Sequence, residues 1–263
     1  MSILATIAFF LILASAAIQA AFAFRKEARP DLLSHWLLLA AALLLAALIA
    51  LRSFAISFPA LTGTFESLVF YALFVCLLGF AYRAQRKLPF LSFVQFGATI
   101  AALALLAVAS SPLAPKDALA PIPALRSGWL VAHVAFSFIG ESFFIVAFVA
   151  SIAYLASRDE RRRKECDRVT YTAVAIGYPI FTAGALVFGM VWAERAWGSW
   201  WSWDPKETWA LATWLVYTFY LHVRLTRARS GALPAWIAVI GFLCAAFTFF
   251  GVNFLLSGLH SYR

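Results

Sequence analysis

Long apolar runs separated by short charged segments make up most of this chain. Eight runs are long enough to cross a bilayer as α-helices, and they cover residues 3–24, 32–51, 65–82, 88–109, 128–156, 169–192, 207–223 and 234–257. A helical crossing takes about 20 apolar residues, whereas the strands of a membrane β-barrel alternate apolar and polar positions. The pattern therefore predicts an all-α, polytopic membrane protein with about eight transmembrane helices.

The first apolar run could be mistaken for a signal peptide. It has no basic residues in front of it, it is longer than the apolar part of such a peptide, and it ends at Arg25 and Lys26, so we expect a retained helix. No soluble module is expected, because the longest exterior connection, residues 110–127, is rich in proline and small residues. We predict two N-terminal helices in residues 1–56 and one membrane domain in residues 57–263.

Basic residues divide between the two sides of the predicted helices. The chain carries a net charge of +9, and alternate connections hold 15 of its 21 Lys and Arg residues. The positive-inside rule places these connections in the cytoplasm and both termini outside. The charge then indicates topology and contact with bilayer headgroups, not nucleic-acid binding. The three cysteines form no CxxC or CxxCH motif, which excludes a thiol oxidoreductase and a c-type cytochrome.

The connection between the sixth and seventh runs is unusually rich in tryptophan. It reads WGSWWSWDPKETW over residues 197–209 and contains five tryptophans. An interfacial aromatic belt explains isolated tryptophans such as Trp129 and Trp236. The density in this loop instead favours a platform for a flat apolar ligand, with haem as the best candidate. The platform residues would be Trp197, Trp200, Trp201 and Trp203.

Charged residues follow and flank this loop. Asp204, Pro205 and Glu207 are typical of a helix start, with Asp204 at the N-cap position and proline at the first helical position. They therefore predict a cap for the seventh helix. Arg126, Arg195 and Lys206 are predicted on the same exterior side, where they could pair with the propionates of a haem.

Two of the four histidines are predicted at the tryptophan-rich face. His133 lies near the exterior end of the fifth run and His260 closes the eighth. Neutral imidazole is a common axial ligand of haem iron, so their placement predicts that this pair holds one haem. His222 lies about 22 Å along a helix from Glu207 and suggests a second site near the cytoplasmic side. His35 has a similar predicted depth, but a residue at a helix end is the simpler interpretation.

Two carboxylates fall within the apolar runs. Acidic residues are costly there and suggest a functional role. We expect Glu66, at the start of the third run, to be structural and to contribute to the site. Glu141 lies eight residues beyond His133, on roughly the same helix face. It either lines a ligand path or bonds a neighbouring helix, and the sequence leaves both open.

The segment WGSWWSWDPKETWALATW resembles the tryptophan-rich WWD signature of haem-handling proteins. Its PKETWA continuation is most similar to the CcsA/ResC family of system II cytochrome c biogenesis. The similarity extends to LRSGWLVAHVAF, GVNFLLSGLHSY and, more loosely, FESLVF, and so covers most of residues 60–263. Residues 1–56 match nothing specific.

The resemblance implies a haem lyase that moves haem b across the bilayer and presents it for thioether attachment to the CxxCH of apocytochrome c. It implies external axial ligands at His133 and His260, an inner haem site at His222, and catalytic residues that include Asp204. Together with the residues singled out above, the predicted haem site contains the WWD tryptophans, Glu66 and Arg126. The second inner ligand would come from a CcsB/ResB-type membrane subunit. The expected location is the bacterial inner membrane or a thylakoid-equivalent membrane, with the WWD loop on the periplasmic side.

Two other functions remain open at this point. One is a haem exporter or relay without ligation activity. The other is a membrane cytochrome b with two histidine ligands. Such a cytochrome pairs its histidines across facing helices at membrane depth, whereas His133 and His260 are predicted at the exterior end, so it is the weaker alternative.

Overall fold

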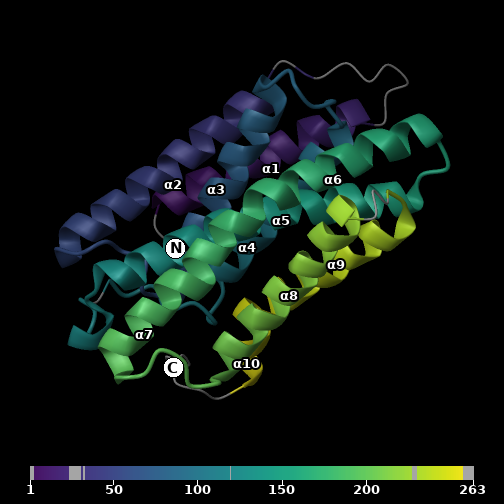
Figure 1. Ribbon diagram of the computed structural model, residues 1–263. Coiled ribbons are helices and arrows are strands. Elements are labelled where there is room, and N and C mark those ends of the chain that lie inside the picture. Colours follow the sequence, from purple (N-terminus) through teal and green to yellow (C-terminus); the bar gives the residue numbers. More distant parts are fainter. Residues whose placement is uncertain (1–2, 24–30, 32, 119, 227–229, 257–263) are drawn as a thin grey trace. The chain divides into compact units, whose positions relative to one another are not determined.

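The computed structural model describes residues 3–23, 31, 33–118, 120–226 and 230–256 (Figure 1). These residues form helices joined by short connections, with no strand among them. The chain divides into two compact units, and the boundary along the sequence lies between Arg126 and Ser127. Seven helices of the described chain are long and apolar enough to cross a membrane. The all-α, multi-pass prediction is therefore confirmed, while the side on which each terminus lies stays a prediction.

The first unit is a four-helix bundle. Each helix packs on the next, and α1 also packs on α4, so the ring closes. Fully buried leucines such as Leu38, Leu45, Leu68 and Leu106 fill its centre. The elements are α1 (Ile3–Ala23), α2 (Ser34–Ile56), α3 (Thr64–Ala84), α4 (Ser92–Ser110) and the 3₁₀ turn η1 (Pro123–Leu125).

The second unit holds four helical rods, two of which contain a π-helical stretch. In it α5 packs on α6 and α9, and α8 packs on α9 and α6; Figure 1 shows α7 continuing the line of α6. The rods are α5 (Gly128–Ala156); α6 (Glu160–Phe181), η2 (Thr182–Phe188) and α7 (Gly189–Trp197); α8 (Pro205–Thr226); and α9 (Ala232–Ala246), η3 (Phe247–Gly251) and α10 (Val252–Leu255).

Helix α6 begins nine residues before the predicted run at 169. Asp159 caps it by accepting a hydrogen bond from the Arg161 N–H at 3.0 Å, and the ion pairs Arg161–Glu165 and Arg163–Glu160 lie along its first turns. These charged turns are helical without being apolar, so hydropathy could not find them.

Helix α8 is less apolar than the other crossings. It has 22 residues, enough to span a bilayer, but it is not among the seven candidate spans of the described chain. Its many Trp, Tyr and Thr side chains lower its hydropathy. The same polar and aromatic groups bond to the neighbouring rod. The Tyr178 hydroxyl of α6 is 2.7 Å from the Thr218 hydroxyl, and the Trp214 indole donates to the hydroxyl of Thr182 in η2 at 3.1 Å.

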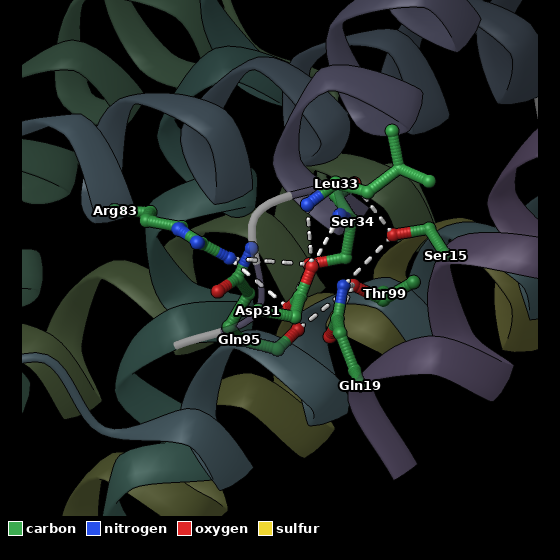
Figure 2. A network of polar contacts seen from close by, with 8 residues as sticks. All are labelled: Ser15, Gln19, Asp31, Leu33, Ser34, Arg83, Gln95 and Thr99. Atoms are coloured by element: carbon green, nitrogen blue, oxygen red, sulfur yellow. Dashed lines mark hydrogen bonds and ion pairs between the residues drawn. The ribbon is translucent and has the colours of Figure 1, made fainter. Parts of the chain in front are cut away.

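A polar network crosses one end of the first unit (Figure 2). The Gln19 amide donates to the Ser15 and Thr99 hydroxyls at 2.9 and 3.0 Å. The Ser15 hydroxyl donates in turn to the backbone carbonyl of Ser34 at 2.8 Å. Buried polar groups are stable when they satisfy one another. These bonds therefore tie α1 to both α2 and α4.

Asp31 is the charged centre of this network. Its buried carboxylate accepts hydrogen bonds from the Leu33 N–H at 2.9 Å and the Ser34 hydroxyl at 2.6 Å, and it pairs with the Arg83 guanidinium at 3.1 Å. Burial pushes the pKa of Asp31 up, but the bonds from Ser34 and Leu33 and the charge of Arg83 outweigh burial. Its pKa therefore lies below the ordinary value of 3.8.

The Asp31 pair predicts a specific dependence of stability on pH. A depressed pKa contributes stability above 3.8, and this contribution is lost as the pH falls through the lower folded-state pKa. Asp31→Asn should therefore lower the unfolding free energy by about 3 kcal/mol at pH 7, and by clearly less at pH 3. Denaturation in detergent at both pH values measures the difference. The exposed Asp117→Asn is the matched control, and an equal loss from both substitutions would contradict the assignment.

Candidate functional site

His133 lies on the second turn of α5 and contacts the π-helical stretch η2. Its Nδ1 is 2.9 Å from the Gly184 carbonyl oxygen. A carbonyl only accepts, so this contact requires a proton on Nδ1, and in the neutral imidazole the lone pair is then on Nε2. A histidine that ligates a metal through one nitrogen commonly donates its other N–H to a backbone carbonyl. The tautomer of His133 is therefore the one that an Nε2 ligand needs.

Two glycines make room for this ring. A Cβ atom at Gly184 would lie 2.4 Å from the backbone nitrogen of Ser137, and one at Gly189 would lie 2.9 Å from Nδ1 of His133. Only glycine allows η2 and α7 to approach α5 this closely. The wide turn of a π-helix, a feature frequent at functional sites, brings the Gly184 carbonyl to the imidazole.

A series of aromatic ring contacts connects His133 to the tryptophan-rich loop. The imidazole stacks on Trp192, with ring centroids 6.3 Å apart and planes 11° apart. Trp192 is fully buried and meets Trp197 edge to face, with centroids 5.9 Å apart. His133 and the loop therefore lie at the same end of the second unit, as the sequence predicts.

The loop itself presents aromatic surface outward. It leaves α7 through Gly198, which has a φ of 73°, and Trp203 also adopts a positive φ of 59°. Such a conformation is strained for a bulky residue and often marks a functional site. Trp200 and Trp203 are 53% and 69% exposed. Among the described residues, the buried indole N–H of Trp201 has no hydrogen-bond partner.

The charged residues after the loop cap α8. The Asp204 carboxylate accepts from the Lys206 N–H at 2.9 Å, and its backbone carbonyl accepts from the Thr208 N–H. Glu207 accepts from the Ser202 N–H and hydroxyl at 2.8 and 3.1 Å, which fixes the loop. The predicted cap is confirmed. A catalytic role for Asp204 stays a prediction.

The remaining histidines have different surroundings. His260 lies outside the described residues. His222 is exposed near the far end of α8, and within the described chain its ring makes no hydrogen bond or ion pair. His35 belongs to the first unit and stacks on Phe80, with ring centroids 5.7 Å apart. The inner haem site at His222 stays a prediction.

Two of the predicted ligand-binding residues belong to the first unit and have partners there. The buried Glu66 carboxylate accepts from Nε of Arg52 at 2.7 Å. The Arg126 guanidinium donates to the Ser57 carbonyl at 3.4 Å. This geometry supports the structural role expected for Glu66, and for both residues haem binding stays a prediction.

Two cations of the second unit lie beside the loop. Arg195 is exposed, with its guanidinium 5.7 Å from the centroid of the Trp129 ring. Lys206 donates from Nζ to the Asn253 side-chain oxygen at 2.8 Å. Arg195 is thus the more accessible partner for an anionic group.

Sequence reasoning did not identify Gly184, Gly189 and Trp192, which shape the surroundings of His133. Glycines in an apolar run are usually packing residues, so they gave no functional signal. Their spacing is informative in retrospect, because Gly184 and Gly189 flank one turn of the helix that ends in the tryptophan-rich loop. A close approach of backbones at that turn is what such glycines permit.

The fold is similar to that of a solved structure. The structure titled Cytochrome c Heme Lyase CcmF matches 98% of this chain with a TM-score of 0.71 and a sequence identity of 19%. The match covers 48% of that chain, so this chain corresponds to about half of it. At this identity the match concerns the fold alone.

Several proteins have a higher sequence identity to this chain. A protein named Cytochrome c biogenesis protein CcsA from Chlamydomonas reinhardtii is 40% identical over 218 residues, which are 78% of this chain and 61% of that protein. Its namesake from Guillardia theta is 34% identical over 239 residues, 78% of this chain and 76% of the relative. The one from Synechococcus sp. (strain CC9902) is 34% identical over 273 residues, with 90% and 88% covered.

The family model described as Cytochrome C assembly protein matches residues 61–260, which include the loop and all the histidines except His35. The resemblance to the CcsA/ResC family is thereby confirmed. The chain is a member of the cytochrome c assembly protein family.

Proposed function

We propose that this protein is the haem-handling subunit of a cytochrome c synthase. It moves haem b to the tryptophan-rich loop and presents it there, at the predicted exterior face, to the CxxCH motif of apocytochrome c. The observation that carries the proposal is the contact between Nδ1 of His133 and the Gly184 carbonyl at 2.9 Å. It prepares Nε2 as an iron ligand beside a platform of exposed tryptophans.

The residues at the loop suit haem as a substrate. Exposed indoles at Trp200 and Trp203 offer apolar faces to the porphyrin. The N–H of Trp201, which lacks a partner among the described residues, and the exposed Arg195 guanidinium suit anionic propionates. His133 supplies one axial ligand and His260, from the C-terminal end of the chain, supplies the other.

The chemistry requires positioning more than acid or base catalysis. Each cysteine thiol of CxxCH adds across one vinyl group, so that sulfur bonds to the inner vinyl carbon and the proton goes to the outer one. No atom is lost and no external oxidant is consumed. The histidine of CxxCH then replaces one of the two axial imidazoles, and this exchange releases the product.

An inner site completes the proposed route. His222 is exposed on α8, far along the helix from the loop. Its position suits a haem held between this chain and a second membrane subunit of the CcsB/ResB type, which would provide the other ligand. An exposed imidazole on a membrane helix is accessible to such a partner.

Covalent product formation tests the proposal. The chain is co-expressed with a CcsB/ResB-type subunit and a CxxCH apocytochrome in a strain without its own maturation system. We expect haem that stays on the cytochrome after acid-acetone extraction. Haem bound to this chain without any covalent product would instead indicate a relay, and would contradict the synthase role.

The tryptophan platform predicts a separate effect. The double substitution Trp200→Ala, Trp201→Ala should lower bound haem at least about threefold, because stacking on one indole contributes roughly 1 kcal/mol, while membrane insertion is unchanged. Pyridine haemochrome spectra per mole of purified chain measure this. Trp236→Ala, at an equally exposed residue near the start of α9, is the matched control. Equal haem in all three proteins would favour an interfacial belt.

A further inference from the structure

The start of α8 is fastened to the C-terminal helical rod by two contacts. Nζ of Lys206 donates to Oδ1 of Asn253 at 2.8 Å. One turn along, the rings of Trp209 and Phe247 pack with centroids 4.4 Å apart. The first contact joins α8 to α10 and the second joins α8 to η3. On the α8 side, both contacts come from the last residues of the segment 197–209.

Charge strengthens the first contact. The Lys206 ammonium is partly buried, and two carboxylates, Asp204 and Glu141, act on it electrostatically. Both are buried, with 6% and 5% of their surface exposed. Asp204 precedes α8, and Glu141 belongs to α5. A buried charge is costly unless it is paired and hydrogen-bonded, so this lysine is held where it lies.

The π-helical stretch η3 determines that Asn253 faces Lys206. Asn253 follows η3 by two residues, and the extra residue of a π turn rotates everything after it by about 100° relative to an unbroken α-helix. Gly251 allows the turn, because a Cβ there would lie 2.4 Å from the Phe247 ring. Without η3, the Asn253 side chain would leave the helix in another direction.

We propose that Lys206 and Asn253 form a clasp that fixes the tryptophan-rich loop relative to the chain segment leading to His260. In this role Lys206 is a positioning residue and not a ligand of the haem propionates. The proposal rests on the proposed function, since it concerns how the second axial ligand reaches the same haem as His133.

The clasp matters because Asn253 and His260 are close along the chain. His260 follows Asn253 by seven residues, which span at most about 24 Å when extended. Asn253 is therefore the anchor from which His260 must reach the iron. Releasing the anchor enlarges the volume that His260 samples and lowers its effective concentration at the iron.

Two readouts on purified full-length protein test the clasp. Without haem, Lys206→Gln and Asn253→Ala should each speed amide hydrogen exchange in residues 252–263 by about tenfold, since a charge-assisted hydrogen bond is lost. With haem, the same variants should lose the low-spin ferric signal of bis-histidine ligation in electron paramagnetic resonance. Added imidazole should restore it. Asn253→Asp keeps an acceptor for the ammonium and should resemble the wild type.

Lys116→Gln is the matched control for loss of a lysine, because its Nζ bonds to the Ser110 carbonyl in the other unit. The proposal would be overturned if Lys206→Gln and Asn253→Ala both exchanged their amide hydrogens at the wild-type rate and both kept the low-spin ferric signal. Loss of all haem in Lys206→Gln with unchanged exchange would also overturn it, because Lys206 would then bind the ligand directly. If the wild type holds no His133-dependent haem, the proposed function fails, and the exchange measurement still decides on the clasp.

Discussion

Replacement of His133 by alanine is expected to remove haem from the tryptophan-rich loop and to abolish covalent attachment. The imidazole is oriented by the Gly184 carbonyl and stacked on Trp192, and alanine provides neither a ligand nor a ring. Mutating a residue that only hydrogen-bonds to a metal ligand typically lowers metal affinity about 10- to 100-fold. Losing the ligand itself should therefore lower haem content at this site at least about tenfold. Haemochrome spectra and acid-acetone-resistant haem measure the two losses.

Chemical rescue separates ligation from folding in this experiment. Exogenous imidazole can occupy the space of the missing side chain, so it should partly restore haem binding to His133→Ala. His35→Ala is the matched control, because His35 lies in the first unit and stacks on Phe80. If His133→Ala keeps a wild-type haem content, the assignment of this residue as a ligand is wrong.

Gly184→Ala is expected to have the second largest effect. The added methyl group would lie 2.4 Å from the backbone nitrogen of Ser137 and 2.6 Å from the backbone carbon of Phe136. Backbone atoms of α5 cannot turn aside as a side chain would, so α5 and η2 must separate. Overpacking of this kind costs about 1–3 kcal/mol, and the separation also breaks the hydrogen bond to His133. Haem affinity should fall about 10- to 100-fold, as for other partners of metal ligands.

Gly128, the first residue of α5, provides the control. A Cβ at Gly128 would meet no atom within 4 Å, so Gly128→Ala should leave haem affinity unchanged and the thermal midpoint equal or slightly higher. Thermal unfolding in detergent and haem titration measure both variants. A Gly184→Ala protein with wild-type haem affinity would show that the carbonyl contact does not orient the ligand.

Most of the fold could be predicted from hydropathy, because a bilayer requires long apolar helices. The exceptions have clear physical causes. The charged first turns of α6, from Glu160, are stabilised by capping and ion pairs that apolar patterns do not register. The π-helical stretches η2 and η3 depend on close packing against neighbouring rods, which periodicity within one run does not reveal.

The polar network around Asp31 was missed because residues 1–56 matched no specific pattern. A signal was nevertheless present in the sequence. Ser15 and Gln19, like Gln95 and Thr99, are polar pairs spaced four residues apart in apolar runs, and such pairs share one helix face. Inside a membrane, polar groups on one face need partners on a neighbouring helix.

The place of the candidate site could be predicted from the sequence, but the packing around it could not. His133 and the aromatic loop were identifiable from residue type and depth. The Gly184 carbonyl that sets the His133 tautomer comes from a residue 51 positions away, and only the packing of η2 on α5 brings the two together. Lys206 was predicted from its charge to meet propionates, whereas the structure pairs it with Asn253.

The most direct test is a structure of the protein loaded with haem, in the presence of the proposed CcsB/ResB-type subunit, determined by electron cryomicroscopy. The account predicts iron bonded to Nε2 of His133, with Nδ1 still donating to the Gly184 carbonyl and the porphyrin lying against the indoles of the loop. Iron coordinated elsewhere, with the His133 ring turned away from the haem, would contradict it.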